Sequence, residues 1–492
     1  MTGRYTVRLG TQSNVIYWDT PWGVPINETF LPQNMKAAGY HTAMFGKWHL
    51  GMFMTKYTPI ARGFDEHMGY FQGCESAFTH IAACCTAGSP DSDQDFVCGN
   101  TDNSWGGKTN ATGKDYRGYD WFRSGPAPAN KGISSPDLSV NHTNSATLIQ
   151  NAAVDFIGRM AKEKDPFFLY LPFQNIHGPY TCEHKYRQMY AGKGFTEGEM
   201  TMFGYMTEMD TAIGEIMTAF KASGKYENSY IFYSSDNGAP PASADVNHQV
   251  GSLPGWIARN YPLRGHKALI WEGGTRVPGF VHSPLLPEKV KGTTSWELYH
   301  VTDWLPTIVG LAGGDTAKNF ALDGHNLWPS LSTGTASPRT EMVYNINPLC
   351  HGGQAGAPKA ALRMGDFKLM SWCYEVAGIA GGNITRPIAC PDEEDGCDPE
   401  FKKGPVLYNL TADIGETTNL AAKEPEQVKK MLARMAFLVS PEGGGMVEPQ
   451  QWTPPFQGDD YFCKDCPLHP GTKGPGSPWL PWLDGHPGID AK

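Results

Sequence analysis

The chain has 492 residues, of which 40% are hydrophobic and 12% aromatic. That is enough apolar surface for one large domain with a smaller one, or for two mid-sized domains. The formal net charge of −10 argues against a nucleic-acid partner, because phosphates call for a basic surface. No apolar run approaches the length of a transmembrane helix, so we expect no membrane span.

Cysteines and N-glycosylation sequons indicate the secretory pathway, with a lysosomal or extracellular destination. Most of the eleven cysteines lie in Gly-, Pro- and Asp-rich stretches, where disulfides would tie surface loops. Zinc is the competing explanation, but C-x-x-C occurs once, at Cys463 and Cys466, without a partner pair at finger spacing. The sequons begin at Asn27, Asn110, Asn141, Asn383 and Asn409. The polar start, Met1 to Tyr5, is not a signal peptide, so we expect the true start to lie upstream.

The first third of the chain predicts short elements around a long irregular stretch. Residues 31–40 predict a helix, and residues 41–45 predict a strand. From about 73 to 136, Gly, Ser, Asp, Thr and Cys dominate without periodicity. A structureless loop of that length is unusual, so we expect a cysteine-tied lid or rim beside a site. A further helix is expected from Asn144 or Ser145, either of which could cap its start.

Strands and helices then alternate. The apolar run at 167–173 predicts a fully buried strand, a helix follows at about 199–223, and another apolar run at 229–234 predicts a buried parallel strand. The inward face of that helix is expected to consist of apolar residues, namely Phe203, Met206, Ile213, Ile216, Met217 and Phe220. This order predicts an α/β fold in which helices sandwich a sheet.

The composition of the chain changes near residue 340. In order, the expected elements are a strand at 277–283, a helix at 301–311, a hairpin at 360–372, a strand at 406–410 and a helix at 425–438. We therefore expect a first domain at 1–340, a smaller antiparallel sheet with a packed helix at 341–440, and an irregular Pro/Gly-rich tail at 441–492.

Polar residues follow the strand at 229–234 directly. Ser235-Asp-Asn-Gly238 stands where a strand delivers side chains to the carboxyl edge of a sheet, the usual place of ligands in open α/β folds. Asp236 and Asn237 supply the oxygen donors that Ca²⁺ or Mg²⁺ prefers. A small basic cluster follows at Arg264, His266 and Lys267. A cation site beside an anion site indicates chemistry on a negatively charged ester, although Asp-Asn-Gly by itself is also good turn chemistry.

Motifs in a fixed order and spacing resemble the sulfatase family. They are Gly46-Lys-Trp-His-Leu-Gly51, Arg62-Gly-Phe-Asp65, Phe173-Gln-Asn-Ile-His-Gly-Pro179, Ser235-Asp-Asn-Gly238, Leu263-Arg-Gly-His-Lys267 and Trp271-Glu-Gly-Gly-Thr-Arg-Val-Pro278. Within the family the chain is most similar to the arylsulfatase B type, which acts on N-acetylgalactosamine 4-sulfate. That similarity rests on Tyr261-Pro-Leu-Arg-Gly265, Ser283-Pro-Leu-Leu286, His300-Val-Thr-Asp-Trp-Leu-Pro-Thr-Ile308 and Leu322-Asp-Gly324. The resemblance runs from Thr2 to about Leu438 and implies an alkaline-phosphatase-like mixed sheet.

The resemblance implies a sulfuric ester hydrolase that acts on a sulfated sugar or an aryl sulfate. Asp236 and Asn237 would be two ligands of a divalent cation, calcium in this branch with magnesium as the alternative. Lys47 and Lys267 would contact the sulfate oxygens.

Two histidines would move the protons. His177 would contact the substrate and protonate the departing sugar oxygen, and His49 would take a proton from the hemiacetal hydroxyl and expel sulfate.

The chain departs from the family at its start. Sulfatases make a formylglycine nucleophile from the Cys or Ser of a C/S-x-P-x-R motif, and two aspartates before it complete the metal shell. The 492 residues contain no such motif, and Thr2-Gly-Arg-Tyr5 resembles the segment that follows it. We therefore expect the N-terminal strand and the nucleophile to be missing, and the chain alone to be inactive. A full-length form would be matured by the formylglycine-generating enzyme.

Two other functions compete with this one. The first is a non-catalytic homologue that binds sulfated glycans, which the presence of both proton-transfer histidines in their motifs argues against. The second is phosphoester hydrolysis on the same fold, which the motifs at 46–51 and 271–274 disfavour.

Overall fold

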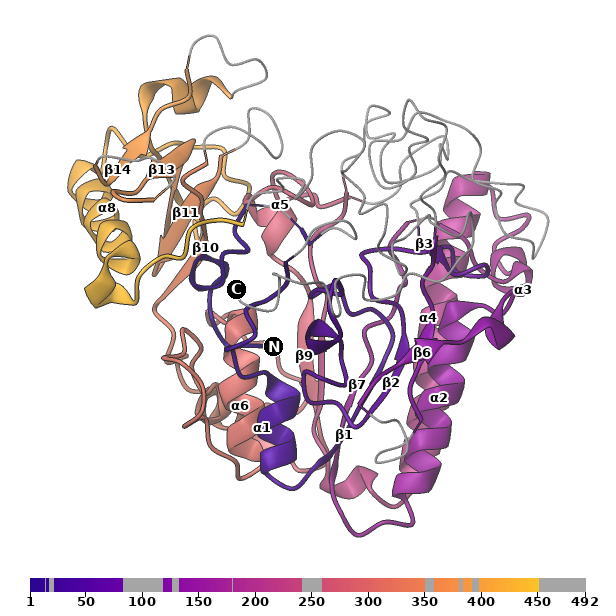
Figure 1. The fold of residues 1–492 in the computed structure, drawn as a ribbon. Coiled ribbons are helices and arrows are strands. Elements are labelled where there is room, and N and C mark those ends of the chain that lie inside the picture. The colour runs from indigo at the N-terminus through magenta and orange to yellow at the C-terminus, as the bar shows by residue number, and fades with distance from the viewer. Residues whose placement is uncertain are drawn as a thin grey trace, which may run out of the picture. The chain divides into compact units, whose positions relative to one another are not determined.

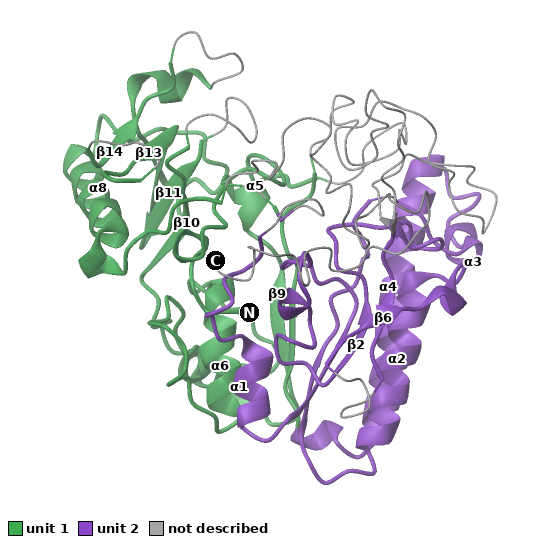
Figure 2. Ribbon diagram, viewed as in Figure 1, with its two compact units in different colours: residues 1–15, 229–241, 258–451 green, residues 16–228, 242–257, 452–492 purple. Residues whose placement is uncertain are grey.

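The computed structural model describes residues 1–13, 15–16, 22–82, 118–125, 132–178, 180–240, 259–349, 358–379, 384–391 and 398–450. Most of the expected lid and most of the expected tail lie outside these residues. Packing divides the chain into two compact units (Figure 2). Unit 1 comprises residues 1–15, 229–241 and 258–451, and unit 2 comprises residues 16–228, 242–257 and 452–492. The boundary expected near residue 340 stays a prediction.

A mixed sheet forms the centre of unit 2 (Figure 1). Among the described residues its strand order is β6 (Ser135–Pro136), β5 (Phe122–Arg123), β2 (Glu66–Gly69), β1 (His41–Phe45) and β7 (Phe167–Tyr170). The central strand β1 runs parallel to β2 and β7, whereas β5 is antiparallel to β2 and β6. A separate short pair joins β3 (Ile81–Ala82) to β4 (Gly118–Tyr119).

The longer helices described in unit 2 are α1 (Leu31–Ala37), α2 (Ser145–Met160), α3 (His184–Gln188) and α4 (Glu197–Ala222). The first two pack on the sheet, whereas α4 packs on α2 and α3 packs on α4. The side chain of Asn144 accepts the backbone N–H of Ala146 at 2.8 Å, which confirms the expected cap of α2. Helix α2 packs against β1, β2 and α4, and α1 packs against β1 (Figure 1).

The strand expected at 167–173 is shorter and less buried than predicted. It ends at Tyr170, and its residues range from half-buried to exposed. Within the described residues β7 is the last strand of its sheet, with β1 on one side. The apolar run therefore marks a strand correctly but does not mark a fully buried one.

The inward face predicted for the long helix was partly wrong. Met206 is 46% exposed, whereas Ile216 and Phe220 are buried as expected. The buried positions of α4 also include Tyr205 and Glu208. A carboxyl group in the middle of the buried face breaks the apolar pattern, which shifted the predicted face around the helix.

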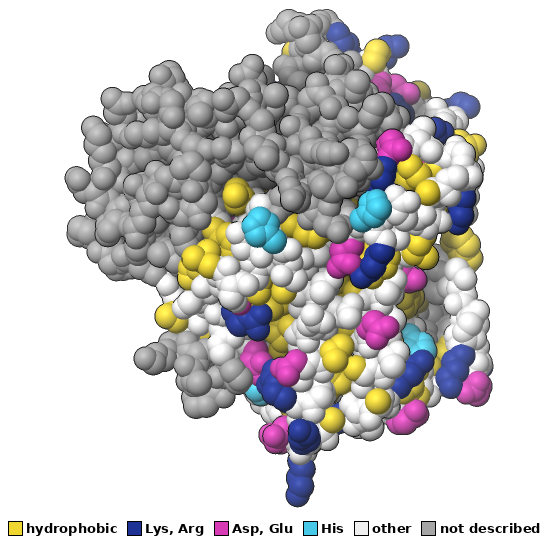
Figure 3. All heavy atoms as spheres, turned by 90° about the vertical axis from the view of Figure 1, so that its right-hand side faces the viewer, with side chains coloured by type: hydrophobic (Ala, Val, Ile, Leu, Met, Phe, Trp, Pro, Cys, Tyr) yellow, Lys and Arg dark blue, Asp and Glu magenta, His cyan; other side chains and the backbone are white. Residues whose placement is uncertain are grey.

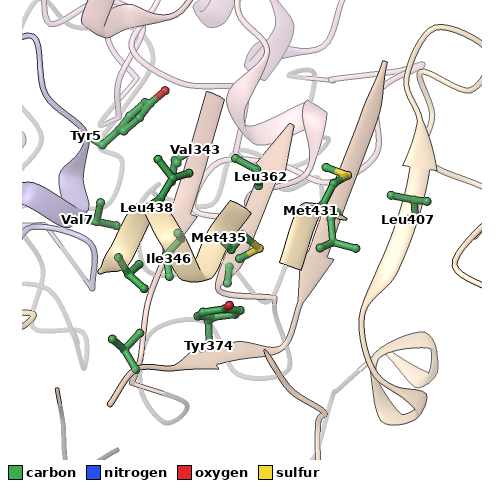
Figure 4. Packing of buried hydrophobic residues seen from close by; sticks show 14 residues of the cluster. Tyr5, Val7, Val343, Ile346, Leu362, Tyr374, Leu407, Met431, Met435 and Leu438 are labelled. Carbon is green, nitrogen blue, oxygen red and sulfur yellow. The ribbon is translucent and has the colours of Figure 1, made fainter. Parts of the chain in front are cut away.

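Unit 1 contains the smaller antiparallel sheet that the sequence predicts. Its strands are β10 (Glu341–Ile346), β11 (Ala360–Met364), β12 (Phe367–Ser371) and β15 (Val406–Asn409), in that order, and a second pair joins β13 (Cys373–Glu375) to β14 (Arg386–Ile388). Helix α8 (Pro425–Val439) buries Met431 and Met435 against this sheet (Figure 4). Further helices are α5 (Glu272–Thr275), α6 (Trp304–Leu311) and α7 (Trp328–Thr333).

The strand before Asp236 lies in unit 1 and is antiparallel, which corrects the prediction of a buried parallel strand. Strand β8 (Ile231–Ser234) pairs with β9 (Gly279–His282), and its residues are half-buried or exposed. An apolar run indicates a strand but does not specify which strand will pair with it or in which direction. Tertiary packing determines that β9 is the partner of β8.

Short 3-10 helices complete the described elements, at Thr6–Arg8, Thr55–Tyr57, Leu138–Val140, Tyr226–Asn228, Glu288–Val290, Val301–Asp303, Pro399–Lys403 and Pro441–Gly443. In the described parts of the chain, none of the helices combines the length and the hydropathy that crossing a bilayer requires. On the face drawn in Figure 3, basic and acidic side chains lie interspersed. In unit 2, Arg159 of α2 forms ion pairs with the buried Glu66 at 2.7 Å and with the exposed Asp155 at 2.9 Å.

Candidate active site

Lys47, His49 and His177 lie on two loops at one edge of the sheet of unit 2. Strands β1 and β7 are parallel, so the loops that follow them, residues 46–51 and 171–178, leave the sheet at the same edge. The backbone N–H of Lys47 donates to the carbonyl oxygen of Pro172 at 2.9 Å, which joins the two loops directly. The structure therefore groups three of the predicted site residues.

Gly46 allows these loops to approach so closely. Its φ is +129°, and a Cβ atom there would lie 2.1 Å from the carbonyl oxygen of Pro172. Trp48 is buried, and its Nε1 donates to the carbonyl oxygens of Gly51 at 3.0 Å and Tyr57 at 2.9 Å. In the Gly-Lys-Trp-His motif, Gly46 and Trp48 thus serve the packing of the loop, and they alternate with the candidate site residues Lys47 and His49.

Hydrogen bonds orient the rings of both histidines. Nδ1 of His177 lies 2.7 Å from the carbonyl oxygen of Gly178, and Nε2 of His49 lies 3.0 Å from that of Ile16. A carbonyl oxygen can only accept, so each of these ring nitrogens carries a proton. In the neutral rings the lone pair is then on Nε2 of His177 and on Nδ1 of His49. Each histidine therefore has a defined atom at which a proton can be exchanged.

Asp236, Asn237 and Lys267 are grouped in unit 1. The N–H of Lys267 donates to the carbonyl oxygen of Ala239 at 2.9 Å, and the N–H of Gly238 donates to that of Gly274 at 3.0 Å. A Cβ atom on Gly238 would lie 1.8 Å from the carbonyl oxygen of Gly273. Close approach of the two segments, and not only a turn, therefore accounts for this glycine.

The cation donors fit a hard metal ion in kind but not in number. Asp236 is exposed, and its Oδ1 accepts the N–H of Asn237 at 2.8 Å. Nδ2 of Asn237 donates to the carbonyl oxygen of Gly238 at 3.0 Å, which fixes the orientation of the amide. Ca²⁺ takes roughly six to eight oxygen ligands. No set of three or more His, Cys, Asp or Glu side chains in the described residues could hold a metal ion, so these two residues supply part of a shell.

A buried charge network, which the sequence did not reveal, supports the segment around Lys267. Lys368 of β12 is fully buried and lies 3.0 Å from a carboxylate oxygen of Glu272 and 2.7 Å from one of Glu416. Glu416 also accepts the backbone N–H of Glu272 at 2.8 Å. Burial alone would raise the pKa of Glu272, but the charge of Lys368 and hydrogen bonds from Lys368 and Tyr344 hold that pKa below its usual value. Lys368 stands within an otherwise apolar strand pattern, and this position was the one feature of the sequence that could have indicated its burial.

Replacing Lys368 by methionine is expected to lower the free energy of unfolding by about 3–5 kcal/mol, because two buried carboxyl groups lose their cation. Denaturant titration measures the change. The exposed Lys430 of α8 provides the matched control, Lys430→Met, which is expected to stay within about 0.5 kcal/mol of the parent. If Lys368→Met were no more destabilising than the control, the network would have no energetic importance.

Several motif residues hold the fold of unit 1 together. The buried pair of Asp303 and Arg339 has Nε of Arg339 at 2.8 Å from the carboxylate. Arg339 also donates to the hydroxyl of Tyr5 at 2.7 Å, and the N–H of Tyr5 donates to Asp323 at 2.8 Å. The carbonyl oxygen of Gly3 accepts the N–H of Asp323 at 3.0 Å. The segments at 2–5, 300–308 and 322–324 thus hold one another.

Three described cysteines, Cys74, Cys373 and Cys390, are disulfide-bonded, and Cys182 is a buried thiol. The remaining seven lie outside the described residues, as do the sequons at Asn110 and Asn383. The sequon residues Asn27 and Asn141 are exposed, and Asn409 is half-buried.

Comparison with known proteins agrees with these observations. The family model described as Sulfatase matches residues 1–314. Arylsulfatase J of Mus musculus is 31% identical over 454 residues, which span 89% of this chain and 66% of that protein. Arylsulfatase A of Homo sapiens is 26% identical over 482 residues, or 96% of this chain and 82% of that protein.

Among solved structures, that of Ps i-CgsB in complex with k-i-k-neocarrahexaose has a TM-score of 0.63 at 23% identity. The match covers 88% of this chain and 79% of that chain. The alkaline-phosphatase-like fold, with its mixed sheet, helices and smaller antiparallel sheet, is confirmed.

Proposed function

The chain belongs to the sulfatase family, and we propose that it serves as a sulfuric ester hydrolase on a sulfated sugar or an aryl sulfate. The observation that carries this proposal is the grouping of Lys47, His49 and His177 on two joined loops, with a defined proton-exchanging atom on each ring. The arylsulfatases J and A that the chain resembles support an aryl or sugar sulfate as the substrate class.

Each residue has one part in the proposed chemistry. Lys47 and Lys267 neutralise sulfate oxygens, on which charge resides throughout the reaction. His177 would act in its protonated form, with a proton on both ring nitrogens, and would give the proton on Nε2 to the departing oxygen. His49 would act in its neutral form and would accept a proton at Nδ1 from the hydroxyl of the nucleophile.

Asp236 and Asn237 are proposed to hold part of the shell of a calcium ion, with magnesium as the alternative. Such an ion would withdraw charge from the ester when bound. The nucleophile is proposed to be a formylglycine. The 492 residues contain no C/S-x-P-x-R segment that could supply it. Tests of turnover therefore use the chain joined, ahead of Met1, to the N-terminal segment of a relative that carries both its two metal-binding aspartates and its C-x-P-x-R motif, produced together with the formylglycine-generating enzyme. We term this the nucleophile-bearing form.

Removal of divalent cations is expected to abolish turnover by the nucleophile-bearing form, and Ca²⁺ or Mg²⁺ is expected to restore it. Hydrolysis of an aryl sulfate is measured after chelation and after readdition of each cation. Asp236→Ala should raise the Ca²⁺ concentration for half-maximal activity by at least about tenfold, because one charged ligand is lost. Activity that ignores the chelator, or that returns only with zinc, would count against the proposed metal.

The protein is proposed to pass through the secretory pathway to a lysosomal or extracellular location. Its disulfide-bonded cysteines and the exposed sequons at Asn27 and Asn141 support this. Peptide-N-glycosidase is expected to increase the mobility of the native protein on a gel, and Asn27→Gln with Asn141→Gln should reduce that shift. No shift, together with eleven thiols that alkylate without reductant, would refute the assignment.

A further inference from the structure

The loop that carries His177 rests on buried polar side chains that the proposed chemistry does not use. Gln174 and Asn175, just before it, are 1% and 9% exposed. The side chain of Gln174 accepts the hydroxyl of Ser145 at 2.8 Å and donates to the carbonyl oxygen of Glu75 at 2.5 Å. The backbone N–H of His177 donates to the carbonyl oxygen of Gln174 at 2.7 Å. The position of His177 therefore depends on how Gln174 and Asn175 are held.

Glu208 of α4 holds Asn175. Nδ2 of Asn175 donates to Oε2 of Glu208 at 3.1 Å and to the carbonyl oxygen of Tyr205 at 2.9 Å. The other carboxyl oxygen of Glu208 accepts the backbone N–H of Glu183 at 2.9 Å. Glu208 is 2% exposed. Both of its oxygens thus bind donors that flank the loop, one before His177 and one after it.

The surroundings of Glu208 are neutral or acidic. The charge of Glu183 acts on Glu208, and the charge of Glu208 acts on Cys182 and Tyr205. Tyr205 is also affected by Glu75 and Tyr180. The nearby cation, Arg187 of α3, forms an ion pair with Glu197 at the start of α4. Burial, with a smaller contribution from the charge of Glu183, raises the pKa of Glu208 to about 7.

We propose that Glu208 is a positioning residue for His177, which clamps the loop 174–183 through Asn175 on one side and the N–H of Glu183 on the other. The clamp makes the loop sensitive to pH. The role of His177 in this inference rests on the proposed function, whereas the hold of Glu208 on the loop does not.

The direction of the pH effect follows from the charge. The pKa of Glu208 is raised from 4.5 to about 7 in the folded protein, so between these values the folded state keeps a proton that the unfolded state has released. Stability from this group is therefore present at low pH, falls as pH rises through that window, and levels off above it. A buried anion beside the carboxylate of Glu183 then weakens the clamp above neutral pH.

Hydrogen exchange of the 492-residue chain, followed by mass spectrometry, tests the clamp without any need for turnover. In Glu208→Ala, amides of the segment 174–183 should exchange at least about tenfold faster, while those of α2 and β1 stay protected. Glu208→Gln retains one acceptor oxygen instead of two, so it should give a smaller increase and should remove the fall in stability between pH 5 and 7. Glu215→Gln, an exposed position on the same helix, should match the parent.

Exchange at 174–183 that is unchanged in both Glu208 variants would overturn the inference. So would a uniform increase across unit 2, because that result would mean that Glu208 only stabilises the unit. Glu208→Gln keeps the test decisive if the alanine variant does not fold.

Turnover provides a second measurement. In the nucleophile-bearing form, Glu208→Gln should lower kcat for an unactivated sugar sulfate roughly 10- to 100-fold with little change in KM, because a misplaced acid acts on the bound ester. The same variant should also shift the alkaline limb of the plot of kcat against pH. An inactive parent would count against the proposed function and leave the exchange result standing. Unchanged kcat and pH profile in an active parent would overturn the positioning of His177.

Discussion

Replacement of His177 by alanine in the nucleophile-bearing form should reduce kcat/KM on an unactivated sugar sulfate by about 10²–10⁴-fold, and on an aryl sulfate with a good leaving group by far less. A general acid contributes most where the departing oxygen is basic. His177 is suited to that part because its Nδ1 is engaged with the carbonyl oxygen of Gly178, so that the proposed proton transfer takes place at Nε2.

The comparison between the two substrates decides the role. His142→Ala, at an exposed histidine of the same unit, serves as the matched control and should change neither rate by more than about twofold. Equal losses on both substrates in His177→Ala would remove His177 from the acid role and leave it as a binding residue.

The 492-residue chain by itself should give no measurable hydrolysis of an aryl sulfate, whereas the nucleophile-bearing form should hydrolyse it. No residue among the 492 stands in a C/S-x-P-x-R segment, and the proposed mechanism depends on a nucleophile made from one. Replacing the cysteine of the joined segment by alanine gives a control that differs at one side chain, and it should be as inactive as the chain alone.

Two outcomes would change the assignment. Robust turnover by the chain alone would mean that a different nucleophile operates. Tight binding of a sulfated oligosaccharide by the nucleophile-bearing form, with its cysteine converted but without turnover, would favour a non-catalytic sulfated-glycan-binding homologue.

The sequence predicted the elements whose signals are local. Asn144 marks the start of α2, and apolar residues at helical spacing define α2 and α8. Strand β2 was not predicted, because Glu66 and its neighbours do not look like an interior strand. Glu66 becomes an interior residue only through hydrogen bonds from His41 and Arg159, which lie far from it in the chain.

The same distinction applies to the candidate site. Motif order identified Lys47, His49 and His177, and the parallel pairing of β1 and β7 explains their grouping. Glu208 and Lys368 escaped prediction, since a charged residue in an isolated stretch of sequence is normally exposed. Their partners lie 33 and 96 residues away, so only the folded chain reveals why these charges are buried.

The contact between Gly46 and Pro172 has a consequence for protein engineering. The backbone at Gly46 is in close contact with the Pro172 carbonyl. Residues 46–51 and 171–178 therefore form a single structural unit, although they are far apart in the sequence. Exchanging either segment alone with that of a relative risks a mismatch at this junction. Libraries that aim to change substrate preference should transplant the two segments together, or leave both fixed and diversify surrounding positions.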